Sequence, residues 1–259
     1  MITVVKIGGH VLDDERQLKD FCRDFAALPG PKALVHGGSA LATKVLEALG
    51  IPSVKVEGRR VTDASTLQVV TMVYAGWYNK QLTATLQGLG CNAIGLSGCD
   101  ASCVTAGIRP PRTLADGKTQ MDYGFVGDVR PSSFDAGFIG SLLERGLVPV
   151  FSAINHDGRG QLLNTNADTM ASCLAAALGA RLLCCFEQKG VLLDINDPDS
   201  VIPVVDSASF GELKAAGTIS AGMLPKLENA FSALRAGASE VIIKSASGLL
   251  GDGGTKVIL

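Results

Sequence analysis

The sequence predicts an α/β protein whose mostly parallel, open sheet is sandwiched between helices. Short apolar runs alternate with segments of helical periodicity along the chain, which is typical of parallel βαβ units. The 31 glycines and only 5% aromatic residues suit a fold with many tight turns between strands and helices. With 259 residues and 47% hydrophobic content, the chain is able to bury a large core as one big or two modest domains.

The expected elements alternate regularly except in one segment. Apolar runs predict strands at 2–7, 32–36, 92–96, 147–152, 181–186, 239–243 and 254–258. Helical periodicity predicts helices at 13–27, 40–49, 63–87, 134–145, 168–178, 206–216 and 223–236. Between residues 98 and 133, Pro110-Pro111 and Asp116-Gly117 favour β-hairpins, which form either a lid over the sheet or a plain surface excursion. A boundary near Leu178-Gly179-Ala180 divides the chain into predicted lobes of 1–179 and 180–259.

The composition argues against several classes of protein. A net charge of −2 without a basic run argues against nucleic-acid binding. The seven cysteines are scattered, and Cys99 and Cys103 have neither a histidine partner nor a second pair, so we expect reduced, largely buried thiols and no metal site. No basic-then-apolar leader precedes the strand that begins by Ile2, and no uncharged stretch reads as a membrane span. These features predict a soluble cytoplasmic protein without a membrane partner.

Two turns from a strand into a helix contain paired glycines. They are Lys6-Ile7-Gly8-Gly9 and His36-Gly37-Gly38-Ser39. Glycine lets the backbone approach a bound group, and a helix N-terminus presents unpaired N–H donors to an anion. At neighbouring strand ends, two such turns would form a cradle for a phosphoryl group, with Lys6 as a fixed cation. Either turn alone is equally explained by turn geometry, so the prediction of phosphate chemistry depends on the pair.

Two further polar segments each open a predicted helix. In Asn164-Thr165-Asn166-Ala167-Asp168, three polar side chains have a spacing of two residues, so an extended backbone would project them to one side. Asn166 or Asp168 alone would be explained as a helix cap. In Ser220-Ala221-Gly222-Met223-Leu224-Pro225-Lys226, the proline suits a first helical turn and places Lys226 there. A lysine at that position opposes the macrodipole unless an anion is bound, and a solvated surface lysine is the alternative.

The segment Gly58-Arg59-Arg60-Val61-Thr62-Asp63 precedes the longest predicted helix. Thr62 or Asp63 is expected to cap that helix. The two arginines are candidates for bidentate recognition of a carboxylate, although at least one is expected to be solvated. Within the helix, an apolar stripe predicts either a homodimer interface or a face buried in the subunit core. The stripe consists of Leu67, Val70, Val73, Tyr74 and Trp77.

Five motifs resemble, in order, those of the amino acid kinase family. They are Lys6-Ile7-Gly8-Gly9, His36-Gly37-Gly38, Gly58-Arg59-Arg60-Val61-Thr62, Asn164-Thr165-Asn166-Ala167-Asp168 and Gly222-Met223-Leu224-Pro225-Lys226. The resemblance covers the chain end to end. Single motifs are shared with aspartokinase, glutamate 5-kinase and uridylate kinase. The Arg-Val-Thr and Asn-x-Asn-x-Asp motifs together favour the acylglutamate branch, the N-acetyl-L-glutamate kinases.

The resemblance implies an enzyme that uses ATP to phosphorylate the γ-carboxylate of N-acetyl-L-glutamate in arginine biosynthesis. It implies that Lys6 and Lys226 contact the transferred phosphoryl group and that Asp168 orients both lysines. Backbone N–H groups of four glycines would donate to that group, namely Gly8, Gly9, Gly37 and Gly38. Arg60 and Asn164 would hold the α-carboxylate, and Asn166 would help to shape the site. Magnesium would be held by the nucleotide phosphates, since the sequence has no dedicated carboxylate cluster.

Two segments depart from the family pattern. Ser39 stands where the family usually has a third glycine, and its effect is left open. Phe186-Glu187-Gln188-Lys189-Gly190 stands where the family usually has a Ser/Thr-Asp-Val-x-Gly turn near the nucleotide, so the nucleotide preference is not settled. The resemblance places the nucleotide against Glu187, Gly190, Gly222 and Met223.

Several alternatives remain open. An N-succinylglutamate would bring an extra carboxylate, which Arg109, Arg112 or Lys118 of the hairpin segment would pair with, unless these are solvated lid charges. Another amino acid kinase substrate or a non-catalytic sensor are further readings, but the intact Lys6, Lys226 and Asp168 argue against the sensor. The resemblance also implies a homodimer built on helix 63–87. Because a strand begins at the second residue, we expect no inhibition by arginine, which in the family depends on an N-terminal helix.

Overall fold

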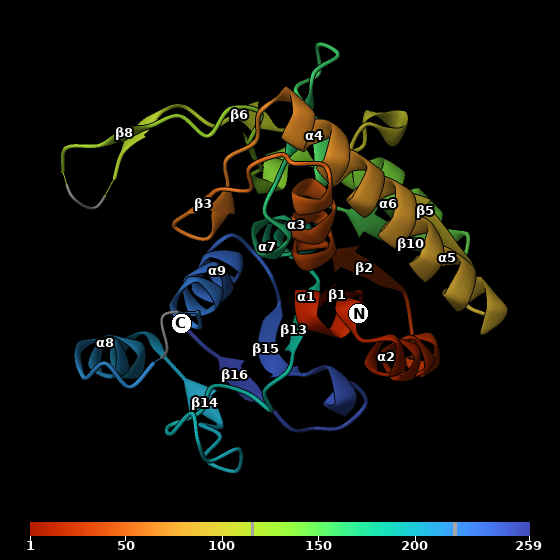
Figure 1. The fold of residues 1–259 in the computed structure, drawn as a ribbon. Helices are drawn as coiled ribbons and strands as arrows, with labels where there is room; N and C mark the ends of the chain where they lie inside the picture. The colour runs from red at the N-terminus through yellow and green to blue at the C-terminus, as the bar shows by residue number, and fades with distance from the viewer. Residues whose placement is uncertain (115–116, 220–221) are drawn as a thin grey trace.

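An eight-stranded sheet runs through the molecule in the order β14-β16-β15-β13-β1-β2-β10-β5 (Figure 1). The computed structural model describes residues 1–114, 117–219 and 222–259. All neighbouring strands are parallel except β15 and β16, which are antiparallel. The strands are β1 (Thr3–Ile7), β2 (Lys32–His36), β5 (Ala93–Leu96), β10 (Val148–Ser152), β13 (Arg181–Phe186), β14 (Val204–Val205), β15 (Glu240–Ser245) and β16 (Thr255–Val257). The predicted mostly parallel sheet is confirmed, and β14 is the strand that the sequence did not predict.

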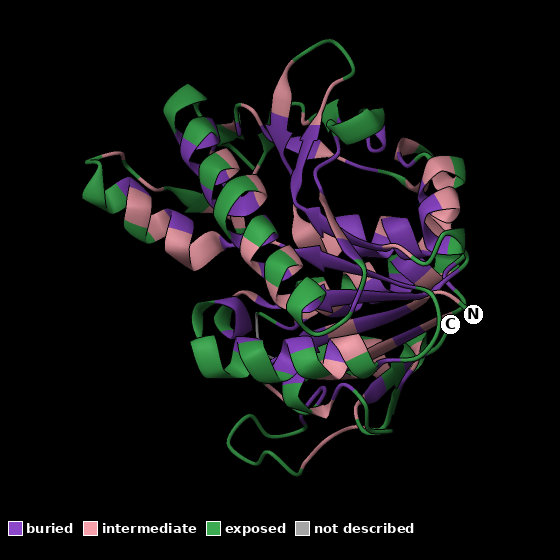
Figure 2. Cartoon of the chain, turned by 90° about the vertical axis from the view of Figure 1, so that its right-hand side faces the viewer, coloured by how far each residue is buried: buried purple, intermediate pink, exposed green. Residues whose placement is uncertain are grey.

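Helices cover both faces of the sheet, and their outer surfaces are exposed while the strands are buried (Figure 2). One face is covered by α6 (Ala136–Glu144), α7 (Ala167–Ala177), α8 (Ser207–Ala215) and α9 (Leu224–Arg235). The other is covered by α1 (Gly9–Asp13), α2 (Glu15–Ala27), α3 (Ser39–Ala48), α4 (Ala64–Thr71), the π-helix η1 (Met72–Tyr78) and α5 (Asn79–Gly88). The layers are therefore helix, sheet and helix, as the alternation of elements predicts.

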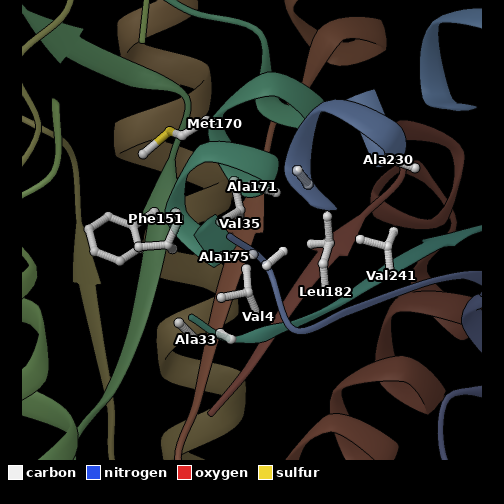
Figure 3. Close-up of a cluster of buried hydrophobic side chains, with 14 of the residues drawn as sticks. Val4, Ala33, Val35, Phe151, Met170, Ala171, Ala175, Leu182, Ala230 and Val241 are labelled. Atoms are coloured by element: carbon white, nitrogen blue, oxygen red, sulfur yellow. The ribbon is translucent and has the colours of Figure 1, made fainter. Parts of the chain in front are cut away.

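The strands divide their side chains between two apolar cores. Val4 packs in the core beneath α7 and α9, whereas the next residue, Val5, packs in the core beneath α2 and α3. This alternation follows from the two-residue period of a strand. Figure 3 shows the first core, in which Phe151 of β10 lies near Met170 of α7 and Leu182 of β13 lies near Val241 of β15. Burial on both faces explains why the central strands are continuous apolar runs in the sequence.

The helix from Ala64 to Gly88 is continuous but contains a π-helical stretch, η1. Its predicted stripe is a face of the subunit core: Leu67, Val70, Val73 and Tyr74 are buried, and only Trp77 is exposed. The physical reason is that this face lies in the second core, where α4 contacts α3 and the strand β12 (Leu162–Asn164). The stripe therefore corresponds to the core alternative, and the exposed apolar side chains of η1 are Trp77 and Met72.

The segment between α5 and α6 contains short hairpins, as predicted. Strand β6 (Gly107–Ile108) pairs with β9 (Gly127–Asp128), and β7 (Arg112–Thr113) pairs with β8 (Gln120–Met121), both antiparallel. In Figure 1 the β7–β8 ribbon extends away from the helices. Single-turn 3₁₀ helices, η2 (Asp100–Ser102) and η3 (Pro131–Ser133), flank the hairpins. The predicted turn at Asp116 lies outside the described residues.

Two more hairpins and two short helices were not predicted. They are β3 (Lys55–Val56) with β4 (Arg59–Arg60), β11 (Ile154–His156) with β12 (Leu162–Asn164), the helix α1 and the 3₁₀ turn η4 (Ala246–Gly248). The two proposed lobes, 1–179 and 180–259, share one sheet because β1 pairs with β13 along its whole length. The division into lobes remains a prediction.

Candidate active site

Both glycine turns lie at the carboxyl end of the sheet, because β1 and β2 are parallel neighbours. Gly38 is the N-cap of α3 and has φ of 152°. A Cβ at this position would lie 2.7 Å from the ring of Tyr78 and 2.8 Å from that of Tyr74, so only glycine fits. The predicted juxtaposition of the turns is therefore confirmed by the register of the strands.

The first turn differs in one respect from its predicted role. The Gly8 N–H already donates to the Cys185 carbonyl oxygen, at 2.8 Å. Gly8 therefore joins the turn to β13 and has no N–H to offer to a phosphoryl group. Gly9 and Gly37 line a cavity above the turns, and a Cβ on Gly9 would meet nothing within 4 Å.

The centre of the site is an ion pair between Lys6 on β1 and Asp168 in the first turn of α7. Lys6 Nζ lies 2.8 Å from Asp168 Oδ1, and the side chains are 10% and 25% exposed. Burial alone would lower the pKa of Lys6, but the charge and hydrogen bond of Asp168 outweigh it and raise that pKa. Burial likewise opposes ionisation of Asp168, yet Lys6 and, more weakly, Lys226 hold its pKa below the ordinary value. Both groups are therefore charged at neutral pH.

Lys226 lies in the first turn of α9, with Pro225 beside it as predicted. Its Nζ donates to the Gly222 carbonyl oxygen at 3.4 Å and lies 5.6 Å from the ring centre of Phe186. In the described part of the chain Lys226 forms no ion pair, so Asp168 bonds one lysine and not both. Of the predicted motif around Lys226, Ser220 and Ala221 lie outside the described residues.

Arg60 is buried without a carboxylate partner among the described residues. One terminal nitrogen donates to the Ser39 carbonyl oxygen at 2.9 Å, the Ser39 hydroxyl at 3.2 Å and the Thr43 hydroxyl at 2.9 Å. The other donates to the Ser53 hydroxyl. All of these acceptors are neutral, so the guanidinium is oriented but its charge is not compensated. This arrangement suits a ligand carboxylate.

The polar motif before α7 reaches the site by a different route from the predicted one. Asn164 ends β12 and its side chain donates to the Thr62 hydroxyl at 3.0 Å. Asn166 is the N-cap of α7, and Asp168 is already helical. The backbone is therefore not extended through all three residues, because the cap turns the chain into the helix after Asn166. All three side chains nevertheless line one cavity.

Two neighbouring cavities contain most of the predicted site residues. The first, of about 220 Å³, is lined by Lys6, Gly9, Gly37, Ser39, Lys55, Arg59, Arg60, Tyr74, Asn164, Thr165, Asn166 and Asp168, among others. The second, of about 720 Å³, is lined by His10, Asp13, Asp14, Gln17, Phe186, Glu187, Gln188, Gly222, Met223 and Lys226. Gly190 lines neither, because it packs against Thr255 and Val201, where a Cβ would lie 2.7 Å and 2.8 Å from their side chains.

Sequence reasoning missed Lys55 and Tyr74 as cavity residues. Lys55 faces Arg60 across the β3–β4 hairpin, whose two loop residues, Glu57 and Gly58, have positive φ of 48° and 75°. A two-residue loop with glycine at its second position is a hairpin signal that precedes the arginines. Tyr74 was predicted only as part of the apolar stripe, whereas it is buried in the wall of the cavity that Arg60 and Ser39 also line.

The remaining polar groups of the described residues do not gather into a metal site. Among residues 1–114, 117–219 and 222–259, no three His, Cys, Asp or Glu side chains gather as metal ligands would. All seven cysteines are free thiols. None of the described helices has the length and apolar character needed to cross a membrane.

Comparison with known proteins places this geometry in a family. The profile of the amino acid kinase family matches residues 1–245. The chain belongs to the amino acid kinase family. Within the family, it is 48% identical to the acetylglutamate kinases of Bacteroides fragilis and Bacteroides thetaiotaomicron, over 99% of this chain and 96% and 98% of theirs.

Solved structures share the amino acid kinase fold. N-acetylglutamate synthase from Neisseria gonorrhoeae, complexed with coenzyme A and N-acetyl-glutamate, matches all of this chain and 59% of its own, with a TM-score of 0.79 and 21% identity. Carbamate kinase from Giardia lamblia, bound to AMP-PNP, matches 99% of this chain and 98% of its own, with a TM-score of 0.70 and 16% identity. At these identities the likeness concerns the fold alone.

Proposed function

We propose that this enzyme transfers the γ-phosphoryl group of ATP to the γ-carboxylate of N-acetyl-L-glutamate, forming an acyl phosphate in arginine biosynthesis. The observation that carries the proposal is the arrangement of three charges between two cavities. Lys6 and Asp168 line the smaller cavity, Lys226 lines the larger, and the charge of Lys226 acts on Asp168. The relatives that are 48% identical over nearly the whole chain are acetylglutamate kinases, which supports this substrate.

The chemistry needs positioning and charge neutralisation rather than a base. A γ-carboxylate has no proton to lose at neutral pH, so its oxygen attacks the γ-phosphorus directly and ADP leaves. Lys6 and Lys226 neutralise the negative charge that the moving phosphoryl group carries, and Asp168 positions Lys6. His36 is fully buried and lines neither cavity, and burial lowers its pKa to about 4, so it is neutral and serves the structure.

The substrate is held in the smaller cavity in this proposal. The uncompensated guanidinium of Arg60 binds the α-carboxylate, and Asn164 lies on the same wall. The γ-carboxylate points to Lys6, next to Gly37. Asn166 shapes the entrance to α7 through its capping bond to Thr169.

The nucleotide lies in the larger cavity in this proposal, against Glu187, Gly222 and Met223. Magnesium accompanies the ATP phosphates, which supply its oxygen ligands. Phe186 packs beneath Lys226 and fills the place of the hydroxyl that the family usually has there. Nucleotide preference is measured directly by comparing kcat/KM for ATP and GTP.

We further propose that the enzyme is a cytoplasmic homodimer that associates through η1. Met72 and Trp77 are 65% and 60% exposed there, which is unusual for large apolar side chains that are close together in one helix. Light scattering on the wild type and on Trp77→Asp tests this. A dimer that the substitution dissociates is the expected result, and a monomeric wild type would exclude it.

A coupled assay of ADP release tests the proposed reaction. N-acetyl-L-glutamate, L-glutamate and L-aspartate are offered in turn with MgATP, and hydroxylamine traps the acyl phosphate. We expect turnover with N-acetyl-L-glutamate and trapping in proportion to ADP. Preference for either free amino acid would assign another amino acid kinase activity, and ligand binding without turnover would indicate a sensor.

A further inference from the structure

The smaller cavity has more positive charge than an N-acetylglutamate would neutralise. Four basic side chains line it, namely Lys6, Lys55, Arg59 and Arg60, against one acidic side chain, Asp168. Asp168 compensates Lys6, and the α-carboxylate of the substrate would compensate Arg60. The lining has a net charge of +3, so the α- and γ-carboxylates of N-acetylglutamate would leave one positive charge over. Lys55 is exposed to solvent, whereas the side chain of Arg59 is only 20% exposed.

Arg59 is poorly compensated by the protein. Its nearest carboxylate is Asp128, with 3.7 Å between Arg59 Nη1 and Asp128 Oδ1. The same oxygen lies closer to Arg109, at 3.1 Å from its Nη2. One carboxylate therefore serves two guanidinium groups, which are only 20% and 12% exposed. Burial, and next the charge of Arg109, lower the pKa of Arg59, whereas Asp128 raises it. The guanidinium stays cationic at neutral pH, so a further anion beside it would be stabilised.

Arg109 is fixed in place rather than solvated. Its guanidinium lies 5.5 Å from the ring centre of the fully buried Tyr123. Its backbone N–H donates to the carbonyl oxygen of Val126, which lines the cavity. Arg112 lies 6.0 Å from the same ring, but it is half-exposed, pairs with Glu57 and does not line the cavity. The hairpin segment thus supplies a fixed cation behind Arg59 and a separate exposed one.

The shape of the ligand indicates that the surplus positive charge of the cavity lies beside the acyl group. An N-acylglutamate has three branches at its α-carbon: the α-carboxylate, the γ-carboxylate arm and the acylated nitrogen. Arg60 and Lys6 take the first two in the proposed function. The third branch then occupies the rest of the cavity wall, where Lys55, Gly58 and Arg59 lie.

We propose that Arg59, supported by Arg109 through Asp128, forms an anion subsite for an acyl group that ends in its own carboxylate. The substrate class is therefore N-acyl-L-glutamates with a dicarboxylic acyl group, of which the succinyl group is a short example, in addition to N-acetyl-L-glutamate. This inference rests on the proposed kinase function. Lys55 adds long-range attraction from the same wall.

Three substrates and two variants test the subsite. We compare kcat/KM for N-acetyl-, N-succinyl- and N-succinamoyl-L-glutamate. The last is a monoamide of the same size as the second, and only the end of its acyl group has lost its charge. The variants are Arg59→Gln and its matched control Arg112→Gln. Calorimetry of the same ligands without ATP gives the ratio of Kd values independently of turnover. Within one variant, the ratio of kcat/KM for the succinyl substrate to kcat/KM for the succinamoyl substrate is independent of general effects on folding or chemistry.

The expected wild-type preference for the succinyl over the succinamoyl substrate is about tenfold or more, equivalent to about 1.4 kcal/mol. Arg59→Gln should reduce that ratio to about two or less, and Arg112→Gln should keep it. A wild-type ratio near one, or an unchanged ratio in Arg59→Gln, would overturn the subsite. An Arg59→Gln variant in which only the binding of MgATP is weaker would also overturn it. If no N-acylglutamate is phosphorylated, the proposed kinase function fails, while the ratio of Kd values still decides the subsite.

Discussion

The two cavities of this enzyme are built in opposite ways. The smaller is walled by buried side chains that the protein already orients, such as Arg60, whose terminal nitrogens donate to three hydroxyls and a carbonyl oxygen. The larger is walled mainly by exposed polar side chains: His10 is 85% and Glu187 44% exposed, with 3.7 Å between His10 Nε2 and Glu187 Oε1. Two buried apolar side chains, Phe186 and Met223, also line it. In the proposed function, the protein is therefore preorganised for the small substrate, whereas the nucleotide itself completes the larger cavity.

This difference between the cavities predicts that replacing Lys6 and replacing Lys226 will change the stability of the protein by different amounts. Lys6 belongs to the oriented side, because Asp168 fixes it at 2.8 Å. Lys226 belongs to the open side, where its only hydrogen bond is a long one to Gly222, among the residues that the structure describes. Substitutions on the two sides should separate stability from catalysis.

Lys6→Ala should have the largest effect. We expect kcat to fall about a hundredfold or more, because charge on the transferred phosphoryl group is greatest in the transition state. The free energy of unfolding should also fall by about 3 kcal/mol, because Asp168 would be left buried and unpaired. Stopped assays and urea titrations measure the two quantities. Lys19→Ala, which breaks an exposed pair with Glu15, is the control and should change neither.

Lys226→Ala should lower kcat by a similar factor of about a hundred but leave the free energy of unfolding within about 0.5 kcal/mol of the wild type. The reason is that no carboxylate bonds Lys226 in the described residues, so none loses its partner. Thermal unfolding and kcat on the same preparation measure both. A loss of stability equal to that of Lys6→Ala would show that the open side is as tightly organised as the other.

Arg60→Gln should act mainly on substrate binding. We expect the KM for the amino acid substrate to rise about 10- to 100-fold while kcat changes little, because the α-carboxylate is held throughout the reaction. The KM for MgATP should be unaffected. Arg23→Gln, at an exposed pair with Asp20, is the matched control. An unchanged KM for the amino acid would assign the anchor to Arg59 instead.

The buried His36 should make the free energy of unfolding depend on pH. Its pKa is lowered to about 4 by burial, against an ordinary 6.5, so below pH 6.5 the unfolded state takes up a proton that the folded state refuses. Stability is therefore lost as the pH falls from 6.5 towards 4. Urea titrations should show a loss of about 2 kcal/mol between pH 7 and 5 from this residue. His36→Gln should lack that component, and an identical slope in both proteins would refute the assignment.

The main sheet could be predicted from the sequence because its strands are buried on both faces. Val4 and Val5 pack in different cores, and such strands appear as unbroken apolar runs. The β3–β4 hairpin could not be predicted in the same way, because strands of two residues have no measurable period. That hairpin places Lys55 opposite Arg60. The missed element therefore carries three of the four basic side chains that line the smaller cavity, namely Lys55, Arg59 and Arg60.

The candidate residues could be predicted by type better than by geometry. Asn164 and Asp168 do line one cavity. They reach it from the end of a strand and from the first turn of a helix, and not from one extended segment. The occupied N–H of Gly8 depends on Cys185, far along the chain, and no local pattern contains it. Likewise, Ser39 bonds Arg60 across 21 residues, which a departure from a glycine motif does not reveal.

The π-helical stretch Met72–Tyr78 works as a phase shift in the long helix. Each residue turns a helix by about 100°, so deleting one residue here would restore an ordinary α-helix. The side chains beyond the deletion would then be rotated about the helix axis. Asn79, the next residue, now donates to His36 at 3.1 Å and to the Val150 carbonyl oxygen at 2.8 Å. These two hydrogen bonds of Asn79 therefore depend on the number of residues in the preceding π-helical stretch. A change in chain length, and not only a change of side chain, would break them.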